Sequence, residues 1–86
     1  MHEIVNEKVG VLTIFDPEKG MVLPKKVKWH NRIYLIEKIG YHHKVRDGRK
    51  LLHIFSVSNN SIALKLCLDT ENLHWILEEV SDGFGD

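Results

Sequence analysis

The sequence contains a single cysteine, Cys67, which excludes an internal disulfide bond and makes a reducing compartment the default expectation. No run of apolar residues approaches the ~20 that a membrane-spanning helix needs. The residues that follow Met1 include Glu3 and lack the apolar centre of a signal peptide. We therefore expect a cytoplasmic protein with no membrane partner.

The spacings that mark metal and catalytic sites are also missing. No Cys-x-x-Cys occurs, and no two of the six histidines stand at the i, i+4 spacing of a helical zinc site. A nucleophilic Cys67 would need a neighbouring base that a third group orients, and the sequence offers no evident carboxylate for that third position. From these absences we predict a protein that is not an enzyme and that binds no metal or cofactor.

The length of 86 residues suits one small domain with one core. Hydrophobic residues make up 43% and charged residues 28%, as in ordinary globular proteins, so a packed core is expected. We predict a single β domain over residues 9–80, with a flexible N-terminus at 1–8 and a flexible tail at 81–86.

Residues 62–69 alternate between apolar and mixed side chains, and this period of two predicts a strand with one buried face. Residues 73–80 fit either a strand or a short helix, because apolar residues also recur there at i, i+3, i+4 and i+7. We favour the strand, since it lets Trp75 and Leu77 lie across from the strand before. The residues expected to be most buried are Phe55, Leu64, Leu66, Trp75 and Leu77.

Three turn signals divide the stretch from Ile33 to Trp75: Asp-Gly at 47–48, Asn-Asn at 59–60 and a four-residue loop at 69–72. Gly40 is expected to bend a long strand over residues 33–45. Counting outward from these loops gives the predicted cross-strand pairs, which are Leu66 with Trp75, Phe55 with Leu64, His42 with His53 and Cys67 with His74.

The first part of the chain adds further strands. Residues 9–15 are apolar on both faces of a strand, which predicts that both faces are covered, with a partner contact as one way to cover the second face. A tight turn at His30-Asn31 follows a strand in which Val27 and Trp29 point inward and lysines point outward. The predicted fold is all-β, with about six antiparallel strands, mostly in meander order, curled into a half-open barrel or a strongly bent sheet.

A resemblance is carried by Pro24, by residues 29–34 (Trp-His-Asn-Arg-Ile-Tyr), by the turn at 46–49 and by residues 75–77 (Trp-Ile-Leu). This pattern resembles a group of small bacterial β proteins of unknown function. That group has a Pro…Trp-x-Gly-Arg-x-Tyr hairpin near its start and a Trp-x-Leu strand near its end. The resemblance covers most of residues 24–80, with Asn31 where the group favours glycine. It implies a compact antiparallel β domain and no activity.

Charge is unevenly distributed, since residues 19–50 carry ten basic and two acidic residues, a net charge of +8. One interpretation is a basic surface, with tyrosines for stacking, that binds nucleic acid. Another is a protein-interaction or homodimerising module, because an antiparallel sheet offers free edges. The basic residues can also simply attract the acidic strands and solvate the domain. The residues predicted for nucleic-acid binding are Lys26, Lys28, Arg32, Tyr34, Lys44, Arg46 and Arg49.

Overall fold

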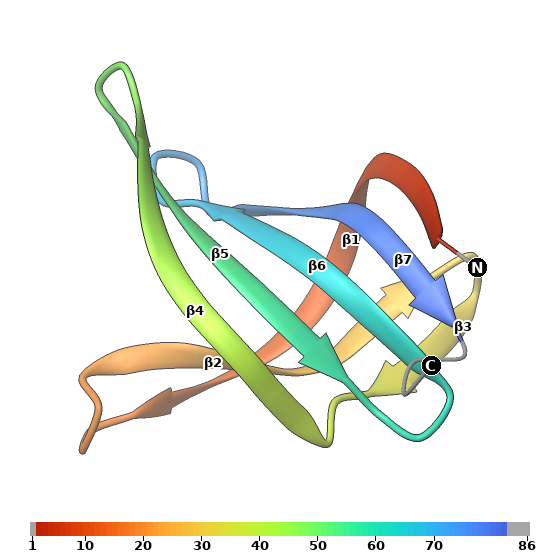
Figure 1. The fold of residues 1–86 in the computed structure, drawn as a ribbon. Coiled ribbons are helices and arrows are strands. Elements are labelled where there is room, and N and C mark those ends of the chain that lie inside the picture. The colour runs from red at the N-terminus through yellow and green to blue at the C-terminus, as the bar shows by residue number, and fades with distance from the viewer. Residues whose placement is uncertain (1, 83–86) are drawn as a thin grey trace.

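The computed structural model describes residues 2–82, which form seven β-strands in one antiparallel sheet (Figure 1). In chain order the strands are β1 (His2–Asp16), β2 (Met21–Trp29), β3 (Arg32–Leu35), β4 (Lys38–Asp47), β5 (Lys50–Ser58), β6 (Ile62–Asp69) and β7 (His74–Asp82). The all-β class is as predicted, with seven strands in place of about six. Residues 2–82 contain no helix of the length and apolar character that could cross a membrane.

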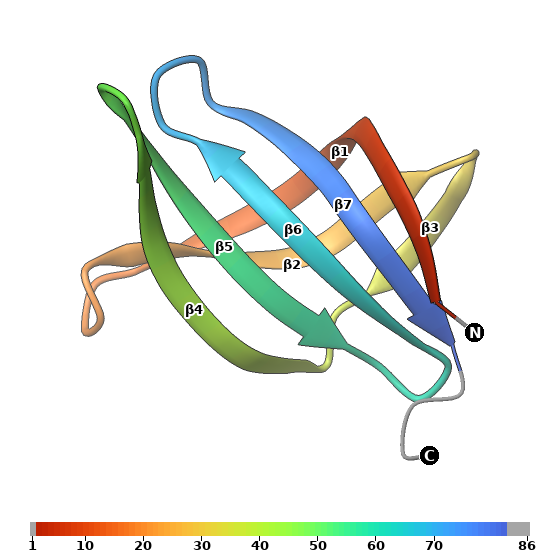
Figure 2. The same cartoon turned by 45° about the horizontal axis from the view of Figure 1, so that its top comes forward.

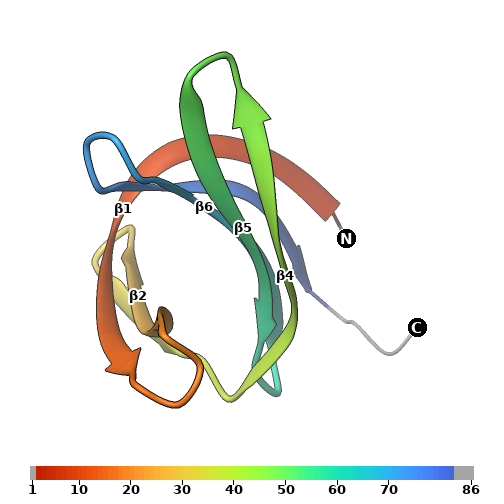
Figure 3. The ribbon, with the colours of Figure 1, turned by 90° about the vertical axis from the view of Figure 1, so that its left-hand side faces the viewer.

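The sheet is strongly curled, and it is not closed (Figures 2 and 3). Its strand order is β3-β2-β1-β7-β6-β5-β4, so β3 and β4, which are neighbours along the chain, form its two edges. The chain passes from one edge to the other at Ile36 and Glu37. The Ile36 N–H donates to the Lys25 carbonyl at 2.9 Å, and the Glu37 N–H donates to the Ser58 carbonyl at 3.0 Å. Two adjacent residues therefore bond to β2 and to β5, the strands next to the two edges of the curl.

The predicted continuous strand over residues 33–45 is wrong, because this stretch is divided between β3 and β4. Breaking at Ile36-Glu37 lets the first part pair with β2 and the second part pair with β5, on opposite edges of the sheet. Gly40 does disturb the ladder as predicted, since the pairing of β4 with β5 shifts register between Ile39 and Tyr41.

Strand β1 begins at His2, earlier than the predicted start at Val9, and residues 2–8, which we expected to be flexible, pair with β7. The apolar and polar residues of this segment do not alternate regularly, because the register shifts between Ile4 and Glu7, where Asn6 has a φ of 53°. At the other end, Ser81 and Asp82 of the predicted tail belong to β7. The remaining tail residues, 83–86, lie outside the described residues.

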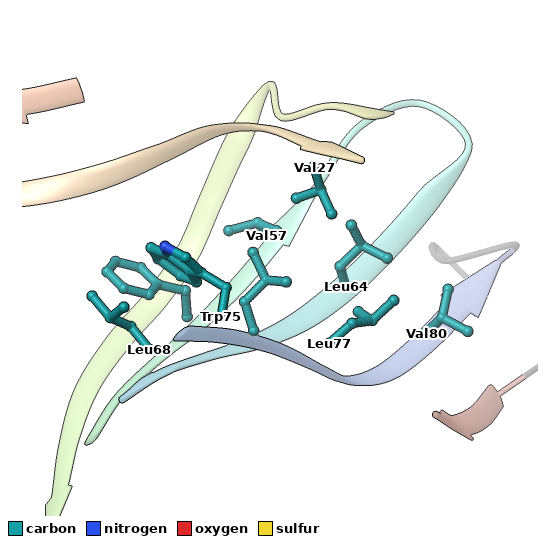
Figure 4. Close-up of a cluster of buried hydrophobic side chains, with 9 residues drawn as sticks. Val27, Val57, Leu64, Leu68, Trp75, Leu77 and Val80 are labelled. Carbon is teal, nitrogen blue, oxygen red and sulfur yellow. The ribbon is translucent and has the colours of Figure 1, made fainter. Parts of the chain in front are cut away.

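The core fills the inside of the curl (Figure 4). Its buried side chains are Val27, Phe55, Val57, Leu64, Leu66, Leu68, Trp75, Leu77 and Val80. All five residues predicted to be most buried belong to it, and Phe55, Leu66 and Leu77 are completely buried, with 0% exposure. Residues 74–82 form a strand and not a helix, which places Trp75 and Leu77 on the core face as predicted.

The predicted registers are wrong by two residues. Leu66 pairs with Leu77 and not with Trp75, and Phe55 pairs with Leu66 and not with Leu64. The loops explain the shift, since they occupy residues 48–49, 60–61 and 70–73, each one residue later than predicted. Moving a loop by one residue moves the register by two, so every side chain keeps its face and the core prediction survives.

Side-chain hydrogen bonds fix the residue at which two of these loops start. Asn59 Oδ1 accepts from the N–H groups of Ser61 and Ile62, at 2.8 and 3.1 Å, so Asn59 stands before its loop and holds it closed. Asp69 Oδ1 accepts from the N–H of Glu71 at 2.9 Å in the same way. The earlier hairpin agrees with prediction, because His30 and Asn31 both have positive φ, 51° and 63°, as a type I′ turn requires.

Candidate interaction surface

The outward side of strands β1, β2 and β3 carries a continuous group of exposed side chains, which we call the outer patch. It consists of Leu12, Ile14, Lys26, Lys28, Ile33 and Leu35. The ladders define its rows, because directly paired residues point to the same side of a sheet. Leu12 pairs with Lys26, which pairs with Leu35, and Lys28 pairs with Ile33 in the next row.

The four apolar residues of the outer patch are between 51% and 62% exposed. Neither Lys26 nor Lys28 has an ion-pair or hydrogen-bond partner for its side chain within residues 2–82. Within the single chain only one face of residues 9–15 is covered, since Leu12 and Ile14 face solvent, and cover of the second face by a partner stays a prediction. A contiguous apolar group with a polar component is the usual mark of an interaction surface.

The basic residues predicted for nucleic-acid binding fall into two groups. Lys26, Lys28 and Arg32 belong to the β2–β3 hairpin, and Lys44, Arg46 and Arg49 belong to the β4–β5 hairpin. The turns of these hairpins lie on opposite sides of the molecule (Figures 1 and 2).

The two groups also face different ways. Lys28 points outward from the curl beside Ile33, whereas Lys44 pairs with His53 and so shares the face of Phe55, which belongs to the core. The residues selected from the +8 segment thus form two separate surfaces.

The two tyrosines have different environments. Tyr34 pairs with the buried Val27 and packs against the core, with its ring centroid 6.2 Å from that of Trp29. Tyr41 is 48% exposed and stacks on His43, with ring centroids 5.2 Å apart. The first basic group therefore lacks the exposed aromatic ring that we expected Tyr34 to supply.

His42 and His53 contact each other, but the prediction that they pair directly across the strands is wrong. His42 pairs with Phe55, and Lys44 pairs with His53, so the two histidines are diagonal neighbours. His42 Nε2 lies 2.7 Å from His53 Nδ1, with one nitrogen donating and the other accepting. The His42 ring also stacks on Phe55, with centroids 4.6 Å apart.

Both imidazoles are held toward their neutral forms. Burial lowers the pKa of His42, and the neighbouring imidazole of His53 and the Lys44 ammonium lower it further. Burial and Lys44 also lower the pKa of His53. Residues 2–82 contain no group of three or more His, Cys, Asp or Glu side chains arranged to hold a metal ion.

The predicted pairing of Cys67 with His74 is wrong. Cys67 pairs with Ile76, and His74 pairs with Asp69, because the loop starts at residue 70. Cys67 is 5% exposed, and burial, with smaller effects from Glu78 and Asp69, raises the pKa of its thiol. The base that a nucleophilic cysteine would need does not lie opposite it.

Sequence reasoning found the two parts of the outer patch without joining them. The apolar residues on both faces of residues 9–15 were visible, and so were the outward lysines. The turn at residues 30–31 already fixes Ile33 opposite Lys28 and Leu35 opposite Lys26. What the sequence does not contain is the pairing of β1 with β2 through a register shift after Leu12, which completes the patch.

Comparisons with known proteins do not supply a function. No family model matches the chain, and neither does any curated protein or solved structure. The resemblance to small bacterial β proteins therefore stays a prediction.

Proposed function

We propose that this chain is a small non-enzymatic binding module whose outer patch binds a protein partner. The observation that carries the proposal is a column of two unpaired lysines on β2 between exposed apolar columns on β1 and β3. A partner that presents carboxylates between apolar side chains would bury the apolar columns and pair with Lys26 and Lys28 at the same time.

A second copy of the chain fits this face poorly. Most soluble homodimers have two-fold symmetry, so the same patch meets itself. Because the lysine column lies in the middle of the patch, a two-fold stack centred on it would set Lys26 and Lys28 against the lysines of the other copy. Like charges in direct contact oppose association, so the patch favours an acidic partner.

Nucleic acid is the other partner suggested by the charge distribution, and the geometry supports it less. Binding of single strands combines a basic groove with exposed aromatic rings on which bases stack. The outer patch has aliphatic side chains in place of rings, and Tyr34 packs against the core. The second basic group, with Lys44 and Arg46, lies on another face.

A selection of displayed random peptides against the immobilised chain tests the proposal. The enriched peptides should combine Asp or Glu with apolar residues at alternate positions, as an extended segment on this face requires. Lys26→Glu and Ile33→Ser should each weaken binding of an enriched synthetic peptide at least about tenfold, the loss of one buried contact or charge pair. The matched control is Lys38→Glu, which reverses a charge on β4 outside the patch.

Three results would contradict the proposal. The enriched peptides could be neutral or basic, they could bind the patch variants as well as the wild type, or Lys38→Glu could weaken binding equally. An oligonucleotide titration at two salt concentrations covers the alternative partner. Binding that weakens steeply with salt and that is reduced by both Lys28→Glu and Arg46→Glu would assign the chain to nucleic acid instead.

A further inference from the structure

One end of the curled sheet contains a hollow of about 320 Å³, which we call the mouth hollow. It lies between the β1–β2 turn and the β6–β7 loop, at the end of the curl that faces the viewer in Figure 3. Its walls are largely apolar and include Phe15, Val22, Leu68 and Leu73. The volume is roughly twice that of a 150 Å³ protein cavity that binds benzene. It therefore suits a small molecule rather than a polymer.

The polar side of the mouth hollow is formed by His53 and Thr70, and the Lys44 ammonium belongs to the residue paired with His53. His53 lines the hollow, and its Nδ1 shares a hydrogen bond with His42 Nε2. His53 Nε2 therefore has no partner among residues 2–82. When His42 donates, the Nε2 of a neutral His53 carries a hydrogen and is a donor. Lys44 pairs with His53 on the same face, and Arg46 follows two residues further along β4. An anionic group placed here would meet donors and positive charge.

The other polar groups near the mouth hollow are already engaged. The Thr70 hydroxyl donates to the Leu51 carbonyl at 2.7 Å. Asp69 is 3.5 Å from the Lys50 ammonium, and it accepts from the N–H of Glu71. The charged neighbour that acts on both imidazoles is Lys44, which lowers the pKa of His42 and of His53. Asp69, the carboxylate of β6, pairs with Leu52, whereas His53 pairs with Leu68, so Asp69 points to the other face of the sheet.

Leu73 supplies an independent observation. It has a φ of 63°, which bulky residues rarely adopt, and its side chain is 70% exposed on the rim of the mouth hollow. Its N–H donates to the Asp69 carbonyl at 2.7 Å, which closes the loop. Asn or Gly would take this backbone conformation at lower energy. Strained backbone conformations cluster at ligand-binding sites, so the exposed leucine at this rim supports a binding role for the hollow.

We propose that the mouth hollow binds a small amphipathic carboxylate. The apolar part would lie against Phe15, Leu68 and Leu73, and the carboxylate would accept from His53 Nε2 and from the Lys44 ammonium. Small-molecule sites have this composition, with apolar walls and a few convergent polar groups. The site lies on the inner face, away from the outer patch, so it does not depend on the proposed protein interaction.

Titration of the full chain with decanoate, followed by amide chemical shifts, tests the proposal, and 1-decanol serves as a probe of the same apolar length without the charge. Decanoate should produce saturable shifts that include Gly20, Leu68 and Leu73, and it should bind at least about tenfold more tightly than decanol. His53→Gln and Lys44→Gln should each weaken decanoate binding severalfold. The matched control is Lys38→Gln, which removes the same charge from a part of β4 outside both proposed sites and should leave decanoate binding unchanged.

The proposal is overturned if decanoate gives no saturable shifts, if decanol binds equally well, or if Lys38→Gln weakens decanoate binding as much as Lys44→Gln does. It is also overturned if a single-stranded oligonucleotide shifts these residues and decanoate does not. Lys44 is exposed, so Lys44→Gln keeps the test decisive even where His53→Gln disturbs folding.

Discussion

His42 and His53 share a 2.7 Å hydrogen bond from diagonal positions in the β4–β5 ladder, with Phe55 directly opposite His42 and Lys44 directly opposite His53. The diagonal arrangement stacks the two imidazoles, with ring centroids 4.9 Å apart. At most one hydrogen can occupy the shared bond, so the pair is compatible with two neutral rings and opposes two charged ones.

Stability should therefore fall as the pH is lowered through the ordinary histidine range. The pKa of each imidazole is lower in the folded chain than its usual value of 6.5, so the unfolded chain takes up protons first. The free energy of unfolding should be constant above about pH 7 and decrease below about pH 6.5. Urea unfolding across this range measures it. The double variant His42→Asn/His53→Asn should lose most of this slope, and an unchanged slope would show that other groups cause it.

Leu66→Ala should lower the free energy of unfolding by about 2–5 kcal/mol, because Leu66 is completely buried and the substitution leaves a cavity in the core. Leu12→Ala is the matched control, since the same atoms are removed from a residue that is 56% exposed, and it should cost about 0.5 kcal/mol or less. Chemical denaturation of both variants gives the comparison. Equal losses would mean that Leu12 is covered in solution, as it would be in a self-associated form.

Gly48 and Gly10 give a test of backbone strain alone. Gly48 has a φ of 64° and no atom within 4 Å of the place where a Cβ would stand, so Gly48→Ala costs only conformational energy, about 1 kcal/mol. Gly10 lies in β1 without a positive φ, and a Cβ there would be 3.8 Å from Lys28 Cβ, an ordinary contact. Gly10→Ala should be neutral or stabilise by up to about 1 kcal/mol. Thermal unfolding of the two variants should therefore give shifts of different size, and equal shifts would refute the positive φ at Gly48.

The alternation of apolar residues was enough to predict the core, and it was not enough to predict the pairing. Leu64, Leu66 and Leu77 were assigned to the buried face correctly, because a side-chain period of two does not depend on the partner strand. Their partners were wrong, because the registers depend on where each loop starts. The sequence prediction puts Asn59 and Asp69 inside their loops. In the structure each stands just before its loop, and its side-chain oxygen accepts a hydrogen bond from a backbone N–H of the loop.

The candidate sites depended on long-range geometry that local patterns do not contain. The break at Ile36-Glu37 separates β3 from β4 and thereby divides the basic residues into two groups. No residue in this short connection is a glycine or proline, so the sequence gives no signal for it. The pairing of β1 with β7 brings together residues from the two ends of the chain, such as His2 and Ser81, and this is likewise invisible to local periodicity.

Leu73→Asn should separate stability from binding. Asparagine tolerates positive φ better than leucine, and Leu73 buries little of its side chain, so the substitution should raise the free energy of unfolding by about 0.5–1 kcal/mol. The same change removes an apolar wall of the mouth hollow and should weaken decanoate binding severalfold.

Leu68→Ala is the contrasting variant, because Leu68 is 7% exposed and its truncation should weaken binding and stability together. Denaturation and decanoate titration on the same samples measure both quantities. If Leu73→Asn destabilises the chain, the strain assigned to residue 73 is wrong. If it stabilises the chain and binding is unchanged, the leucine is not part of the ligand site.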